Sequence, residues 1–122
     1  MWRRIRSRRR PSAAPLRPIA EAEFDVRFSR RQMRLRLYAP RLRRDGVTWA
    51  CRYTIDYPVG IRGAGVGETS LQAMFEALRG ASRALYGSAQ FRSGRLGFWK
   101  GFGRDLVLPA TSDMLDVAPF PF

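Results

Sequence analysis

The sequence contains no histidine and only one cysteine, Cys51, and these shortages remove most of the familiar catalytic sites. Histidine is the usual general base near neutral pH, and it completes the Ser-His and Cys-His nucleophile pairs and most zinc sites. A single cysteine cannot form an internal disulfide, and no secretion signal is visible, so we expect a cytoplasmic location. The acids between residues 45 and 105 are scattered rather than clustered. We therefore expect a protein that is not an enzyme, with no catalytic residue, no metal site and no cofactor.

The sequence also has no long apolar run and almost no lysine. No stretch approaches the ~18 apolar residues of a transmembrane helix, so none is predicted. Lys100 is the single lysine among 23 basic residues. Acids are rare in the first 44 residues, where three of them face fifteen arginines, whereas the rest of the chain is almost neutral. Such a local positive field favours an anionic partner, which is a nucleic acid, an acidic protein or an anionic membrane.

The first 18 residues hold seven arginines, three prolines and no acid. This segment cannot bury enough apolar surface to offset its ordering entropy, so we expect a flexible arm. Three interpretations remain open. The arm is a basic tail that reflects base composition, a functional arm whose arginines bind phosphates, or a cleaved targeting segment. Beyond it, we expect one domain over residues 19–109 and an extended tail rich in proline and phenylalanine over residues 110–122.

Apolar and polar residues alternate from Ala22 to Phe28 and again from Met33 to Tyr38, and this alternation predicts a β-hairpin. Its expected register places Asp25 opposite Arg36, with Arg34 in diagonal reach of the same carboxylate. Part of the hairpin's basic charge would then be used in exposed ion pairs. In this register the expected facing pairs are Phe28 with Met33, Val26 with Leu35, and Phe24 with Leu37.

The segment from Val47 to Tyr57 is the clearest strand, with Cys51 in the middle of its apolar face. A buried thiol there is expected to be inert. Residues 61–66 fit a weaker strand or a loop, and the glycines up to residue 67 lack the spacing of a nucleotide-binding loop.

A helix is predicted from Thr69 to Tyr86, because Thr69 and Gln72 form a capping box. Gly80 in its middle suggests close backbone packing on the sheet. Residues 91–104 mix aromatic, basic and glycine residues, as in a short edge strand whose aromatics close the core, or in a base-stacking surface. The apolar stripe expected to face the sheet comprises Leu71, Met74, Phe75, Leu78, Ala81, Ser82 and Leu85.

Together these patterns predict an α+β fold, in which a small antiparallel sheet of about four to five strands, starting with a β-hairpin, packs on one main α-helix. The strand Trp49–Ile55 reads W-x-C-x-Y-x-I, and Gly67 to Ala73 reads G-x-x-S-x-Q-A before the helix. This combination resembles a family of small uncharacterised bacterial domains and covers about residues 19–108. The resemblance implies the fold and, by analogy with compact accessory and immunity-type proteins, a role in binding; it implies no activity.

We expect a non-enzymatic binding protein with an anionic partner, most simply a nucleic acid held without sequence specificity. The alternative is a protein-binding accessory or immunity-like module that uses its sheet face or its phenylalanine-rich C-terminal end. Oligomeric state is left open. The candidate nucleic-acid-binding residues are Arg3, Arg4, Arg6, Arg8, Arg9 and Arg10 in the arm, supported by Arg30, Arg31, Arg41, Arg43 and Arg44.

Overall fold

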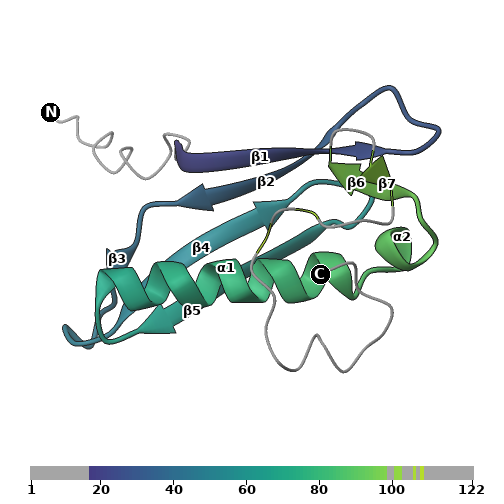
Figure 1. The fold of residues 1–122 in the computed structure, drawn as a ribbon. Helices are drawn as coiled ribbons and strands as arrows, with labels where there is room; N and C mark the ends of the chain where they lie inside the picture. The colour runs from purple at the N-terminus through teal and green to yellow at the C-terminus, as the bar shows by residue number, and fades with distance from the viewer. Residues whose placement is uncertain (1–16, 99–100, 103–105, 107, 109–122) are drawn as a thin grey trace, which may run out of the picture.

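The computed structural model describes residues 17–98, 101–102, 106 and 108, and it shows one antiparallel sheet with a long helix on one side (Figure 1). Along the sheet the order is β3-β4-β2-β1-β6-β7. Strands β2 and β3 pair with different ends of β4, and β5 pairs with β4 along its whole length. The predicted α+β class is confirmed, but the described residues form seven strand segments instead of four or five. The strands are β1 (Pro18–Val26), β2 (Met33–Tyr38), β3 (Arg41–Leu42), β4 (Trp49–Ile55), β5 (Ile61–Gly67), β6 (Leu96–Phe98) and β7 (Gly101–Phe102).

The long helix is α1 (Ser70–Tyr86), and a single turn, α2 (Ala89–Arg92), follows it. The predicted cap is present: the Thr69 hydroxyl accepts a hydrogen bond from the Gln72 backbone N–H at 3.0 Å. The side-chain oxygen of Gln72 accepts in turn from the backbone N–H of Glu68 at 2.8 Å, one residue earlier than a standard capping box. The first bond satisfies a backbone donor that the first turn of a helix leaves without a partner, and the second ties the residue before the cap to the helix.

The hairpin of β1 and β2 forms, but its predicted register is wrong by four residues. Phe24, not Phe28, lies opposite Met33, and Glu21 lies opposite Arg36. Phe28 is 90% exposed in a left-handed turn conformation, with φ of 69°. The shift arises because the end of β1 leaves β2 and pairs with β6, where Val26 lies opposite Leu96. A shift by an even number keeps every side chain on its predicted face.

Helix α1 covers the sheet as predicted, and Ala81, Ser82 and Leu85 of the predicted stripe are buried, but the first half of the stripe is different. Its alanines at 73, 77 and 81 are fully buried, whereas Leu71 is 74% and Phe75 is 52% exposed. The reason is the close approach of β5: a Cβ atom added to Gly65 would lie 2.1 Å from the backbone nitrogen of Ala77. Large side chains on this face would hold the helix away from the strand, so small residues face it.

Gly80 marks close packing, as its position in the helix predicts. A Cβ atom there would lie 3.0 Å from the hydroxyl of Tyr53, whose ring is buried between the helix and the sheet. The aromatic residues after α1 also close the core: Phe91 packs edge-on against Tyr86 with ring centres 4.9 Å apart. Phe98 meets Phe24 in the same way at 6.2 Å. The core therefore lies between α1 and one face of the sheet, and it leaves the other face open.

Candidate anion-binding face of the sheet

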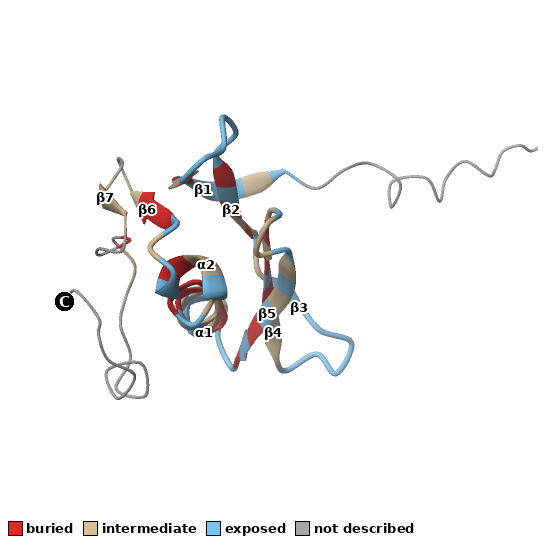
Figure 2. Ribbon diagram, turned by 90° about the vertical axis from the view of Figure 1, so that its right-hand side faces the viewer, coloured by how far each residue is buried: buried red, intermediate tan, exposed pale blue. Residues whose placement is uncertain are grey.

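The sheet face opposite α1 is not covered by any described helix (Figure 2). Side chains alternate along each strand, so the neighbours of the buried residues point to this outer face. On β2 these are Arg34, Arg36 and Tyr38, which flank the buried Leu35 and Leu37. On β4 and β5 they include Arg52, Thr54, Arg62 and Ala64. The outer face therefore carries arginines from three neighbouring strands.

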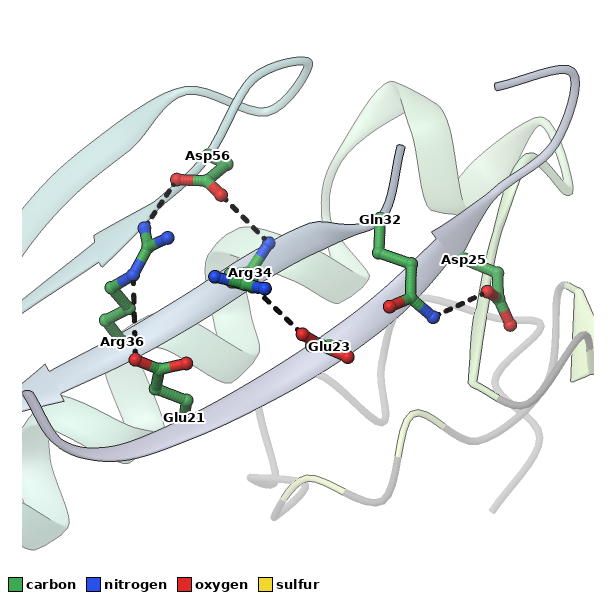
Figure 3. Close-up of polar contacts among 7 residues, drawn as sticks. All are labelled: Glu21, Glu23, Asp25, Gln32, Arg34, Arg36 and Asp56. Atoms are coloured by element: carbon green, nitrogen blue, oxygen red, sulfur yellow. Dashed lines mark hydrogen bonds and ion pairs between the residues drawn. The ribbon is translucent and has the colours of Figure 1, made fainter. Parts of the chain in front are cut away.

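The arginines of β2 are already paired with acids (Figure 3). The Arg34 Nε atom lies 2.9 Å from a carboxylate oxygen of Glu23. Arg36 lies 2.8 Å from Asp56 and 3.9 Å from Glu21. The hydrogen bond to Asp56 raises the pKa of the Arg36 guanidinium above its ordinary value. The prediction that ion pairs use part of the hairpin's charge is therefore correct.

The acid that was predicted to pair with these arginines is not their partner. Asp25 lies near the turn and accepts a hydrogen bond from the Gln32 side-chain amide at 3.1 Å. The four-residue change in register brings Glu21 and Glu23 opposite the arginines instead. Exposed pairs of this kind each stabilise a fold by less than about 1 kcal/mol. Their main effect is to reduce the positive electrostatic field at the outer face of the sheet.

Three other arginines converge at the opposite end of this face, around a hollow of about 130 Å³. Arg17 directly precedes β1, Arg41 lies in β3 and Arg52 lies in β4. Strand pairing brings them together, because Pro18 lies opposite Tyr38 and Arg41 lies opposite Ala50. In the part of the chain that the structure describes, none of the three arginines has a carboxylate within ion-pair distance. The hollow is completed by Tyr38, Ala39 and Ala50.

The turn that follows β3 is held by Asp45. Its carboxylate accepts hydrogen bonds at 2.9 Å from the backbone N–H groups of Val47 and Thr48, and at 2.7 Å from the Thr48 hydroxyl. The Thr48 backbone bond contributes most to lowering the pKa of the Asp45 carboxyl to about 2. This acid is therefore occupied by its own turn, and the exposed side chains of Arg43 and Arg44 extend the basic end of the sheet.

The structure places the described candidate arginines in two groups. Arg41, Arg43 and Arg44 lie together at the β3 end of the sheet. Arg30 and Arg31 lie in the turn between β1 and β2, at the opposite end (Figure 1). The two groups of described candidate arginines therefore lie at opposite ends of the sheet. The six arm arginines between residues 3 and 10 lie outside the described residues.

Sequence reasoning missed Arg17, Arg52 and Tyr38 as members of this site. Alternation along β4 placed Arg52 on the face opposite Cys51, so its exposure was available from the sequence. What the sequence lacked was the neighbourhood, since residues 17, 38, 41 and 52 meet only through the pairing of β1, β2, β3 and β4.

Cys51 lies on the other face, fully buried in the core. Its thiol donates to the backbone carbonyl of Tyr38 at 3.1 Å, and burial raises its pKa. Within the described ranges, no three His, Cys, Asp and Glu residues are grouped so that they could hold a metal ion. None of the described helices has both the length and the apolar character needed to cross a membrane.

We expect Cys51 in the folded protein to resist a thiol reagent at neutral pH. The thiolate is the reactive form, and neither solvent nor a cationic side chain stabilises it at this buried position. Labelling followed by mass spectrometry should be at least ~100-fold slower for the native chain than for the same chain in denaturant, because reaction requires local opening. Equal rates in the two states would contradict the assignment of Cys51 to the core.

The sequence matches one family model, described as "Domain of unknown function (DUF6968)", over residues 20–110. No curated protein and no solved structure gives a match. The matched range begins within β1 and extends past the described residue Leu108, so it includes most of β1, both helices and every later strand that the structure describes.

Proposed function

We propose that this chain, which belongs to the DUF6968 family, is a non-enzymatic binding protein whose partner is a nucleic acid. The observation that supports this proposal is the convergence of Arg17, Arg41 and Arg52 around one hollow, where none of them forms an ion pair with a described carboxylate. Elsewhere on the same face, Arg34 and Arg36 are neutralised by acids from adjacent strands. Uncompensated positive charge on an open surface attracts polyanions and accelerates their association.

Arginine suits phosphate better than it suits a generic anion. Its planar guanidinium presents N–H groups in a fork that matches two oxygens of one phosphate, and it stays charged at any physiological pH. The arm extends this charge along the chain, and its prolines at 11 and 15 disfavour a regular helix or strand there. Contacts from such a segment follow a phosphate backbone without reading bases, so we propose binding that is not sequence-specific. The six arm arginines are Arg3, Arg4, Arg6, Arg8, Arg9 and Arg10.

The salt dependence of binding tests this proposal. We expect the full chain to bind labelled oligonucleotides of unrelated sequence with similar affinities, measured by fluorescence anisotropy. If the six arm arginines contact phosphates on a duplex, the slope of log affinity against log salt should be about −5 or steeper, at ~0.9 per contact. A single strand should give a shallower slope of about −4, at ~0.7 per contact. No measurable binding, or an affinity that does not change with salt, would overturn the proposal.

A protein partner is the second candidate, and the outer side of α1 favours it. Leu71 and Phe75 lie one turn apart and are both exposed, although each is a large apolar residue. Arg79 lies 5.8 Å above the Phe75 ring and also binds Glu76 at 3.2 Å, so charged groups border this apolar pair. The affinity of a partner that binds through Leu71 and Phe75 would change little with salt, whereas affinity through phosphate contacts falls steeply. The variant Phe75→Ala would abolish binding of the first kind only.

A further inference from the structure

The hollow at the β3 end of the sheet has the features of a site for one anionic group. Its three arginines come from three separate segments of the chain that the pairing of the strands brings together. The pairing of Leu37 with Tyr53 places the next residue, Tyr38, beside Arg52 on the outer face. Among the described residues that line the hollow, three are arginines and none is acidic, so an anion placed there would meet positive charge from several segments.

The size of the hollow limits what it can hold. The hollow measures about 130 Å³. Pockets for drug-sized ligands and cofactors are larger, at about 300–1,000 Å³. The hollow is therefore smaller than a usual pocket for a complete nucleotide, and phosphate is a small anion that suits its three arginines.

The remaining lining residues support this selection. Ala39 and Ala50 contribute small, apolar side chains that leave space and add no side-chain acceptor to compete for the guanidinium N–H groups. The Tyr38 hydroxyl already shares a hydrogen bond with the Thr54 hydroxyl at 3.3 Å. The arginines are thus the principal side-chain donors available to a ligand.

We propose that this hollow is a phosphate subsite that holds one phosphate of a bound nucleic-acid strand through Arg17, Arg41 and Arg52. This inference rests on the proposed function and adds a defined binding position for one phosphate on the folded domain. Arg17 is seven residues from Arg10, and an extended chain of seven residues spans at most about 25 Å. A strand held in the hollow is therefore within reach of the arm arginines.

The test compares variants in which one arginine is changed to glutamine at different positions on the outer face of the sheet. Arg52→Gln and Arg41→Gln each remove a guanidinium from the hollow. Arg62→Gln is the matched control, because Arg62 is an exposed arginine on the outer face of the neighbouring strand β5 but does not line the hollow. None of the three arginines takes part in an ion pair among the described residues, so the fold should persist in all variants, as checked by thermal melting.

Binding is measured with two labelled 12-nucleotide thymidine strands, one ending in a 5′-phosphate and one in a 5′-hydroxyl. We expect Arg52→Gln and Arg41→Gln to lower the affinity for at least one strand by about 10-fold or more, as for the loss of a charge-assisted contact, and Arg62→Gln by no more than ~2-fold. A loss confined to the phosphorylated strand identifies a terminal phosphate as the ligand. An equal loss for both strands identifies an internal phosphate of the backbone.

Equal, small losses for all three variants would overturn the subsite, because the arginines would then act only through their summed charge. In that case both strands still bind and the proposed function stands. If the unmodified chain binds neither strand, the proposed function itself fails. Inorganic phosphate provides an independent readout: it should compete with the strand for the unmodified chain and for Arg62→Gln, and less for Arg52→Gln.

Discussion

A chain that lacks residues 1–16 should bind duplex DNA at least ~100-fold more weakly than the full chain at 0.1 M salt, because six potential phosphate contacts are removed. The salt slope should lose about 5 units, at ~0.9 per contact, and retain only the contribution of the folded domain. The cut is placed before Arg17 because this residue lines the hollow and Pro18 begins β1. Anisotropy titrations at four or more salt concentrations measure both quantities.

A full-length variant with all six arm arginines changed to glutamine is the matched control, since it keeps the chain length and removes only the charge. It should bind as weakly as the truncated chain. Both forms should melt within about 2 °C of the unmodified protein, because the composition of the arm predicts that it contributes little buried apolar surface. If the truncated chain bound as tightly as the full chain, the arm would be irrelevant, and the folded sheet face would account for all binding.

Replacing Gly65 with valine should destabilise the fold by more than about 3 kcal/mol, a large share of the 5–15 kcal/mol that stabilises a typical domain. The Cβ atom of a residue at this position would lie 2.1 Å from the Ala77 nitrogen and 2.5 Å from the Ala73 carbonyl oxygen. Both are backbone atoms of α1, so no change of rotamer relieves the overlap, and the helix must move off the sheet. Thermal unfolding should show a midpoint lower by more than about 12 °C, or no cooperative transition.

Ala64→Val is the control for this change, because it adds two methyl groups to the adjacent residue of the same strand. Ala64 is exposed on the outer face, away from α1. Valine suits a strand, so the stability of this variant should stay within about 0.5 kcal/mol of the unmodified protein. A Gly65→Val protein that melted like Ala64→Val would show that α1 does not pack directly on β5.

Local sequence patterns predicted the elements of this fold well. Alternation identified β2 and β4, and it assigned Cys51, Tyr53 and Ile55 to the buried face. The capping residues placed the start of α1 within one residue of the observed position. These features depend on residues that are close together in the chain. The repeat of apolar residues at two or 3.6 positions and the capping residues can therefore be read from the sequence alone.

The hairpin register and the buried stripe of α1 were predicted less well, for reasons that lie outside these local patterns. The hairpin register depends on β6, which takes the end of β1 although about 70 residues separate them in the chain. Hydrophobicity favoured Leu71 and Phe75 for the buried stripe. Because Gly65 has no side chain, α1 approaches β5 closely, and the small alanines of the helix are buried instead. Size complementarity between distant elements therefore decided which side of the helix is buried.

For the candidate site, the sequence by itself determined the chemistry: an excess of arginine near the N-terminus, no histidine and few acids in the first 44 residues. It also showed which arginines of the strands face outward. Only the tertiary structure decided which of these charges remain available, because neutralisation is a matter of distance between strands. Arg34 and Arg36 meet acids across the sheet, whereas Arg17, Arg41 and Arg52 meet one another around a hollow.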